Sequence, residues 1–367
     1  MIISSLQRLT VGCFAALRHG LDRVSGWLWS SPTLSGWFYA PEPVLSRDDA
    51  YRKFNSTYFA QLDQQERMLA DRPRMTFYHA IIERHVAPGS RVIDLGTGTG
   101  ILAAFAARQG AARVYAIDHA AILDVAQEVI AHNRVPNVEF IAQHSSDVVL
   151  DEPVDIILHE QMGDYLFDES MVANICDLRD RLLKPGGRIL PSRFEFYCEP
   201  VKLHDERHVP FIWDLNLFGI DYGFIKEQRP DEAEYYRQAS CDLGVVEAFL
   251  GEPKAAIEFD LHTVDDATMP RKIRIKRPVV TAGRLDGFAV YFKVLVDDDL
   301  TLSSSPLDPD RAPHWGFRLL RCEMDDLGVG DVVTLTLEVG RWADPDSWNW
   351  HYERRSAAAL AEMPTAS

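Results

Sequence analysis

The pattern of apolar and polar positions changes near Pro191. Before that point, short apolar runs of strand length alternate with stretches of helical spacing. The runs lie at 91–95, 112–118, 138–141, 154–158 and 188–190. The helical stretches lie at 47–70, 75–85, 101–109, 122–133 and 171–183, with a break near Pro73. Strands and helices that alternate in this way predict a doubly wound parallel sheet of the α/β class.

Beyond Pro191 the pattern becomes that of β-strands. Short runs of alternating polarity appear, such as RFEFYCEPV, AIEFDLHTV, FAVYFKVLV and DVVTLTLEV, and helical patterns are few. These runs predict an antiparallel β domain. Residues 211–239 interrupt it with helical patches and aromatic side chains, so we expect an excursion from the sheet there. Residues 356–367 are alanine-rich and polar, and we expect them to fray.

Residues 1–45 combine a helical repeat with a proline-containing linker at 31–43. The repeat consists of Leu6, Leu9, Phe14, Leu17, Leu21, Val24 and Leu28. Arg8 and Arg18 interrupt it, so no uncharged run reaches the length of a transmembrane helix. We expect an amphipathic helix that docks on the body of the protein or on a partner, with membrane-surface binding as the alternative.

Composition limits the classes of partner. The chain has 367 residues, 47% of them apolar, which is enough for two globular domains. A formal charge of −17 disfavours a nucleic-acid partner and fits a basic peptide or a cationic small molecule, or a general solubility charge. The five cysteines are scattered without a CxxC pair. We therefore expect no disulfide framework, no zinc or other metal site, and a reducing, cytoplasmic location.

A glycine-rich turn, DLGTGTG, follows the apolar run at 91–95. Its candidate cofactor residues, with the acid that ends the next strand, are Asp94, Gly96, Gly98, Gly100 and Asp118. Glycines allow a sharp turn and a close approach to a ligand, and the acid can accept both hydroxyls of a ribose. The GxGxG spacing, with LKPGG before a later strand, favours S-adenosylmethionine over a nicotinamide cofactor.

The segment HEQMGDYLFDESM, residues 159–171, carries Glu160 and Glu169. Glu160 follows an apolar strand, at the edge where open α/β sheets bind ligands. The segment is long enough to loop back and aim both carboxylates at one cation. Two carboxylates can grip a planar guanidinium in fork geometry. The alternative is an acidic loop with solvated side chains.

Together these motifs resemble the protein arginine methyltransferases. The motifs are VIDLGTGTGILAAFAARQGAARVYAID, HEQMGDYLFDESM, LKPGGRILP and GFAVYFKVLV, then LSSSP and PHW, and the likeness runs from about residue 54 to 338. It implies a Rossmann-like methyltransferase domain at 46–190 that binds S-adenosylmethionine. A β-barrel substrate domain at 191–355 would follow, with a helical dimerisation arm at about 211–239 and a homodimeric assembly.

The resemblance also implies roles for single residues. Glu160 and Glu169 match the paired catalytic glutamates, and Pro313-His314-Trp315 is similar to the family's threonine-histidine-tryptophan loop. The other implied roles are donor carboxylate binding by Arg74, a hydrogen bond from Asp71 to His314, adenine contact near Ser146 by Asp147, and a substrate channel lined by Met68, Met171 and Trp315.

The chemistry of methyl transfer agrees with these roles. The enzyme must align the nucleophile with the methyl carbon, and two carboxylates can localise positive charge on the guanidinium nitrogens that do not react. They repel each other in an empty site, so one pKa should rise. His314 is a candidate acceptor for the departing proton if Asp71 orients it, with a structural role between domains as the alternative.

Four residues of the 159–171 segment depart from the family pattern, namely His159, Gln161, Asp164 and Asp168. We expect them to alter the substrate rim. The predicted function is an S-adenosylmethionine-dependent N-methyltransferase acting on arginine in a protein or peptide. Two alternatives stay open: a small guanidine or amine metabolite as acceptor, and a methyltransferase-like scaffold without turnover.

Overall fold

The structure, a computed structural model, describes residues 53, 55–204, 211, 213, 216–231, 233–240 and 243–361. The chain divides into two units, Met1–Asn55 and Ser56–Ser367, and the elements below belong to the second. The predicted helix and linker at 1–45 lie outside the described residues. In the part that is described, no helix is both long enough and apolar enough to cross a membrane.

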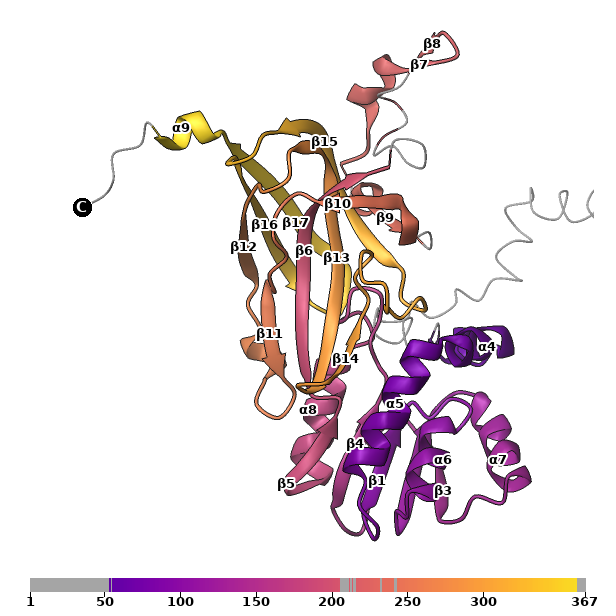
Figure 1. The fold of residues 1–367 in the computed structure, drawn as a ribbon. Helices are drawn as coiled ribbons and strands as arrows, with labels where there is room; N and C mark the ends of the chain where they lie inside the picture. Colours follow the sequence, from indigo (N-terminus) through magenta and orange to yellow (C-terminus); the bar gives the residue numbers. More distant parts are fainter. Residues whose placement is uncertain are drawn as a thin grey trace, which may run out of the picture. The chain divides into compact units, whose positions relative to one another are not determined.

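A five-stranded parallel sheet forms the first half of this unit, as predicted (Figure 1). Its strands are β1 (Arg91–Leu95), β2 (Arg113–Asp118), β3 (Val138–Ala142), β4 (Val154–His159) and β5 (Leu183–Leu190). They pair in the order β3-β2-β1-β4-β5, so the order reverses between β1 and β4. Ligands of open α/β sheets bind at the carboxyl ends of the strands beside such a reversal. The glycine turn follows β1 and Glu160 follows β4, so both lie at this point.

Five α-helices accompany the parallel sheet among the described residues: α4 (Leu62–Ala70), α5 (Arg72–His85), α6 (Ile101–Arg108), α7 (Ile122–His132) and α8 (Met171–Leu182). The break between α4 and α5 falls at Asp71, two residues before Pro73. The Asp71 carboxylate accepts a hydrogen bond from the backbone N–H of Arg74 and caps α5, while Pro73 stands in the first turn, where no N–H is needed.

The motif LKPGG does not act as predicted. We expected it to end a helix before a strand at 188–190, but β5 already begins at Leu183. The pairing with β4 shifts between Val154 and Ile156, and Gly186 adopts a φ of +75°. A side chain at Gly187 would collide with Leu183. The two glycines therefore form a bulge inside the strand, not a turn before it.

Two antiparallel sheets form the second half and confirm the predicted β domain (Figure 1). The larger sheet has the order β10-β6-β13-β15-β9, with β11 on β6 and β14 on β13. Its strands are β6 (Arg193–Leu203), β9 (Arg237–Ser240), β10 (Val246–Phe249), β11 (Ile257–Asp260), β13 (Gly283–Asp297), β14 (Leu300–Ser303) and β15 (Phe317–Leu327). The smaller sheet consists of β12 (Lys272–Pro278), β16 (Val332–Arg341) and β17 (Asp344–Arg355). A short helix, α9 (Ala357–Ala361), follows.

The excursion expected at 211–239 consists of short elements. Two small strands, β7 (Asn216–Leu217) and β8 (Ile220–Asp221), form a hairpin, and the helical turns at 223–228 and 233–236 are of the 3-10 type. Phe218, Ile220 and Phe224 are exposed there, and Phe218 is 103% exposed. The described part of this segment thus presents apolar side chains to the outside.

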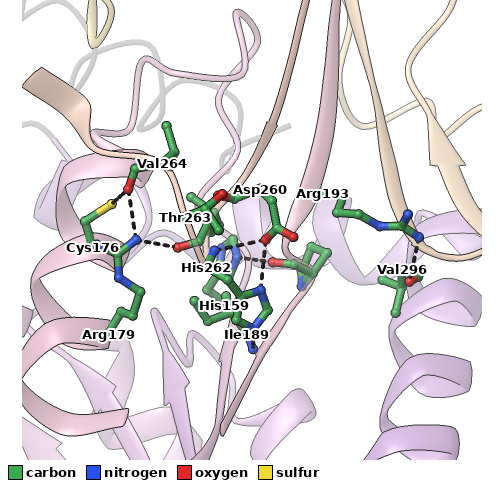
Figure 2. Close-up of polar contacts among 12 residues, drawn as sticks. His159, Cys176, Arg179, Ile189, Arg193, Asp260, His262, Thr263, Val264 and Val296 are labelled. Carbon is green, nitrogen blue, oxygen red and sulfur yellow. Dashed lines mark hydrogen bonds and ion pairs between the residues drawn. The ribbon is translucent and has the colours of Figure 1, made fainter. Parts of the chain in front are cut away.

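Helix α8 and strand β5 contact the chain segment that follows β11 (Figure 2). Arg179 on α8 donates to the carbonyl oxygens of Leu261 and Val264 at 2.8 and 2.9 Å. The backbone N–H of Ile189 donates to the Nε2 of His262 at 3.1 Å. The segment with Glu160 and Glu169 runs from the end of β4 to the start of α8. Because α8 contacts the residues after β11, the Glu169 end of this segment is tied to the antiparallel half.

Candidate functional site

The glycine turn after β1 has a conformation that its glycines make possible. Gly96, Gly98 and Gly100 adopt φ values of +70°, +53° and +82°, a region that other residues enter only with strain. The N–H groups of Gly96 and Thr97 donate to the carbonyl of Ile117 on β2. A side chain at Gly96 would meet nothing within 4 Å. The turn is held by the sheet and leaves open space beside its first glycine.

Asp118 ends β2 beside this turn, as the sequence predicts. Its carboxylate accepts hydrogen bonds from the backbone N–H groups of Gly98 and Ala120 at 3.1 and 2.9 Å. Burial raises its pKa, and these N–H groups oppose the rise. The carboxylate is therefore fixed at the carboxyl edge of the sheet, next to the middle glycine.

Asp94 lies inside the fold, with no exposed surface. One carboxylate oxygen accepts from the hydroxyl of Thr97 at 2.6 Å and from the N–H of Ala103 at 2.9 Å. Among the described residues, the other oxygen has no hydrogen-bond partner. Burial raises the pKa of Asp94 to about 6. Asp94 therefore links the glycine turn to α6, while its second carboxylate oxygen is left as an unused hydrogen-bond acceptor.

Helix α4 lies against the glycine turn. A side chain at Gly98 would stand 2.8 Å from the Oε1 of Gln65, a buried residue of that helix. Gln65 is fixed in turn, because its Nε2 donates to the carbonyl of Phe59. Met68 follows on the same helix and is 8% exposed. The segment that includes α4 thus lies over the turn.

The predicted adenine end of the site is more open. Asp147 ends a short 3-10 helix, Ser145–Asp147, and its side chain is exposed. It accepts a hydrogen bond from Ser146 at 3.2 Å. The ring of His144, which lies just before the 3-10 helix, meets the ring of His119 edge to face, with centroids 5.6 Å apart. No contact of Asp147 with Asp118 is seen, so its role stays a prediction.

Glu160 forms a buried ion pair with Arg74. Their Oε2 and Nη2 atoms are 2.6 Å apart, and the two side chains are 12% and 9% exposed. The Nη1 of Arg74 donates to the carbonyl of Met68, and its guanidinium lies 5.8 Å from the ring centroid of Trp315. Burial alone would lower the pKa of Arg74, but the charge and hydrogen bond of Glu160, together with Tyr78 and Asp71, outweigh it and the pKa is raised.

Glu169 has no such partner. No hydrogen bond reaches its carboxylate from the residues that the structure describes. Burial raises its pKa well above the ordinary value, and the charges of Glu160 and Asp168 raise it further. For Glu160, burial also raises the pKa, but Arg74 opposes the rise. Arg74 thus favours the ionised form of Glu160, whereas burial and the neighbouring carboxylates favour the protonated form of Glu169.

Asp71 bridges the two halves of the unit. One carboxylate oxygen caps α5, and the other accepts a hydrogen bond at 2.8 Å from His314. The donor is the backbone N–H of His314, so Asp71 fixes the loop and does not orient the imidazole. Burial lowers the pKa of that imidazole to about 4, and the charge of Arg74 adds to the effect. His314 is neutral at physiological pH.

Trp315 and Met171 are both almost fully buried, at 1% and 0% exposure. The indole N–H of Trp315 donates to the carbonyl of Met162 at 2.6 Å, and its ring packs against Phe292. Met171 begins α8, two residues after Glu169. Neither side chain faces solvent, so both belong to the core, and their role in a substrate channel stays a prediction.

His159 is not a rim residue, contrary to the expectation from the sequence. It has no exposed surface, and its Nε2 lies 2.8 Å from the carbonyl of Pro191. Burial lowers its pKa to about 4. Figure 2 shows it in the close-up of the contacts around Ile189 and His262. His159 is a neutral structural residue that joins the end of β4 to the start of the antiparallel half.

Asp168 is not a rim residue either. Its carboxylate accepts from the backbone N–H of Tyr165 at 2.9 Å and occupies the space beside Gly163, where any Cβ would collide with it. Burial raises its pKa to about 6. Asp168 therefore closes the turn from within. Gln161 is close to Asn174, at 3.4 Å, and Asp164 forms an ion pair with Arg318.

Sequence reasoning missed Tyr78. It is fully buried, and its hydroxyl donates to the carbonyl of His159 at 3.0 Å, next to Glu160. Its ring lies under the guanidinium of Arg74 at 5.9 Å. The available signal was its position four residues after Arg74 in one helix, which places both side chains on the same face.

The comparisons with known proteins follow the division of the chain into a parallel-sheet half and an antiparallel half. A family model described as ribosomal protein L11 methyltransferase (PrmA) matches residues 78–192, which contain all five parallel strands. A probable protein arginine N-methyltransferase 6 of Arabidopsis thaliana is 34% identical over 284 residues, which cover 74% of this chain and 62% of that protein. Protein arginine N-methyltransferase PRMT10 of Oryza sativa subsp. japonica is 31% identical over 304 residues, covering 74% of this chain and 79% of the relative.

A solved structure extends the likeness to the antiparallel half. The crystal structure of protein arginine methyltransferase 10 of Arabidopsis thaliana, described as uniquely open, superposes with a TM-score of 0.69. The superposition covers 83% of this chain and 96% of the other, at 26% identity. Both sheet systems and the order in which they follow each other are therefore shared.

Proposed function

The chain belongs to the protein arginine N-methyltransferase family, and we propose that it methylates a guanidino nitrogen of arginine in a protein or peptide with S-adenosylmethionine as donor. One observation carries this proposal: two partly buried carboxyl groups, Glu160 and Glu169, lie after β4, whose neighbour β1 leads into the glycine turn. This arrangement supports a cation site next to a nucleoside site. A scaffold without turnover would not require that arrangement.

The residues at the turn fit the donor. Gly96 leaves room for a close approach, Asp118 offers a fixed carboxylate for ribose hydroxyls, and Asp94 keeps an unused acceptor for an amino group. The Nε of Arg74 is buried without a partner among the described residues, which supports donor carboxylate binding by this side chain. When bound, S-adenosylmethionine supplies a methyl group activated by its sulfonium.

The two glutamates would hold the acceptor guanidinium and shape its charge. Glu160 is kept ionised by Arg74 and offers its remaining lone pairs to one nitrogen of the acceptor. Glu169 would take a second nitrogen once it loses its proton. Positive charge is then drawn to the two held nitrogens, so the third becomes the better nucleophile.

The departing proton needs an acceptor, and the two candidates differ. Glu169 would hold the reacting acceptor directly, whereas burial lowers the pKa of His314 to about 4, so its imidazole binds a proton weakly. We propose that Glu169 takes the proton first and that His314 passes it outward through water.

Acceptor binding should release a proton and should strengthen as the pH rises. The pKa of Glu169 is raised in the empty site, and a guanidinium favours the ionised carboxylate, so binding shifts this equilibrium. We expect the KM for a peptide acceptor to fall as the pH rises above the ordinary range of a glutamate, by at most about ten-fold per pH unit while Glu169 is still protonated in the free enzyme. Peptide titration calorimetry in buffers of different ionisation enthalpy measures the released proton directly. A KM that is flat or rises over this range would contradict the assignment.

The same raised pKa has a consequence for stability. An unfolded glutamate ionises near pH 4.3, below the pKa of Glu169 in the folded chain. The folded protein therefore holds the extra proton, and stability falls as the pH rises through this range. A peptide acceptor should offset part of that loss, which thermal denaturation with and without peptide can measure.

The proposed function is tested by incubation of the purified protein with labelled donor, an arginine-containing peptide library and free guanidine metabolites. We expect label on peptide arginine, identified by mass spectrometry. Label on the free metabolites alone would favour the small-molecule alternative, and no label with intact donor binding would favour a scaffold.

We further propose a homodimer and a reducing, cytoplasmic location. The exposed Phe218, Ile220 and Phe224 of the predicted arm support an apolar contact with a second copy. The described cysteines, Cys176 and the buried Cys198 and Cys322, are all free, as a reducing compartment allows.

A further inference from the structure

The two glutamates are joined by a tight hairpin, residues 162–168. The backbone N–H of Leu166 donates to the carbonyl of Gly163 at 2.8 Å and closes it. Leu166 adopts a φ of +72°, and Ser170, just after Glu169, adopts a φ of +57°. Both are left-handed conformations that side chains with a Cβ enter only when the surroundings hold them. The hairpin therefore depends on contacts from outside.

The position of the Glu169 carboxylate depends on this hairpin. Among the described residues, none donates a hydrogen bond to that carboxylate, and its neighbours Glu160 and Asp168 raise its pKa by their charge. Nothing but its own backbone thus fixes it in the empty site. The backbone is held from the other side only weakly, by Asn174 at 3.4 Å from the Glu169 carbonyl.

The apolar side chains of the hairpin pack into the core, with Phe167 against Phe196 and Trp342. Strand β15 and the residues just before it supply polar contacts from outside. Trp315 binds the carbonyl of Met162 at the start of the hairpin. Arg318, three residues later, forms an ion pair with Asp164, and its guanidinium lies 5.4 Å from the ring centroid of Tyr165. The two charged side chains are 24% and 34% exposed, so the pair is partly shielded from water. Arg318 thus contacts two successive residues, Asp164 and Tyr165, at the tip of the hairpin.

We propose that Asp164 and Arg318 are a positioning pair, which fixes the 162–168 hairpin and with it the Glu169 carboxylate for the acceptor guanidinium. This inference rests on the proposed function. The Nε of Arg318 has no partner among the described residues, and loss of Asp164 would leave a half-buried guanidinium with less compensation.

The test is a charge-exchange series on methyl transfer to a peptide. The variants are Asp164→Asn, Arg318→Gln and the exchanged pair Asp164→Arg with Arg318→Asp. We expect each single variant to raise the KM for the peptide about ten-fold, since a misplaced carboxylate weakens acceptor alignment. The donor Kd should stay within about two-fold, whereas the kcat at saturating peptide should also fall, because Glu169 acts on the acceptor in the transition state. The exchanged pair should recover most of the KM, and hydrogen exchange at 162–170 should rise in the single variants only.

Asp299→Asn serves as the matched control, because Asp299 forms an exposed ion pair with Arg84 outside the site. It should leave all three constants unchanged. An unchanged peptide KM in both single variants overturns the proposal, as does a loss of donor affinity and thermal stability in step with KM. An exchanged pair as impaired as the two single variants combined also overturns it. If the unmutated chain transfers no methyl group to peptide, the proposed function fails instead, which this series separates from failure of the pair.

Discussion

Glu160→Gln should abolish methyl transfer while S-adenosylmethionine still binds. Glutamine keeps an oxygen that can accept from the Nη2 of Arg74, now 2.6 Å from the Glu160 carboxylate, so the geometry of the site is retained. What disappears is the negative charge that localises the positive charge of the acceptor. Loss of one such electrostatic group lowers kcat by about 10²- to 10³-fold, which initial rates with labelled donor and peptide measure.

The control for this variant acts on the other half of the site. Asp118→Ala removes the carboxylate that is fixed by Gly98 and Ala120 beside the glycine turn. It should weaken donor binding, measured by calorimetry, and leave the acceptor site intact, so that saturating donor restores much of the rate. If Glu160→Gln loses donor affinity together with transfer, Glu160 does not belong to the acceptor pocket.

The parts of the site that the sequence predicted are those set by local structure. Gly96, Gly98 and Gly100 adopt left-handed backbone conformations, which glycine favours, so their spacing in the sequence predicts the turn. Asp118 and Glu160 follow strands whose apolar runs are short and clear, so their place at the carboxyl edge follows from the parallel sheet. Such features depend on a few neighbouring residues, and one sequence contains them in full.

The parts that the sequence could not predict depend on contacts between distant residues. His159 and Asp168 lie in a polar segment that looks solvated, yet one binds the carbonyl of Pro191 and the other fills the space beside Gly163. The partner of Asp164 is Arg318, 154 positions later in the chain. Burial in this loop is decided by the antiparallel half that packs over it, and no pattern within the segment reports that packing.

The ion pair of Arg74 with Glu160 is another such contact, and removal of its cation should have the second large effect. Arg74→Leu leaves Glu160 buried beside Glu169 without a compensating charge. Loss of one partner of a buried pair costs about 3–5 kcal/mol of unfolding free energy, and donor binding should be lost as well because the guanidinium is the proposed partner of the donor carboxylate. Urea denaturation and donor calorimetry measure the two effects separately.

The pH dependence of this loss identifies its cause. Without Arg74, burial would hold the pKa of Glu160 still further above its unfolded value near 4.3. The uncompensated charge then costs most at pH 8 and little below pH 4.3, where the carboxyl is protonated in both states, so the difference in stability from the unmutated chain should shrink as the pH falls.

Arg74→Lys is the matched control: it keeps a positive charge beside Glu160 and should recover most of the stability. Its single ammonium cannot bind Glu160, the carbonyl of Met68 and the donor carboxylate in the fork geometry of a guanidinium, so donor affinity should stay low. Equal stability of Arg74→Leu and the unmutated chain at pH 8 would show that the pair contributes nothing to the fold.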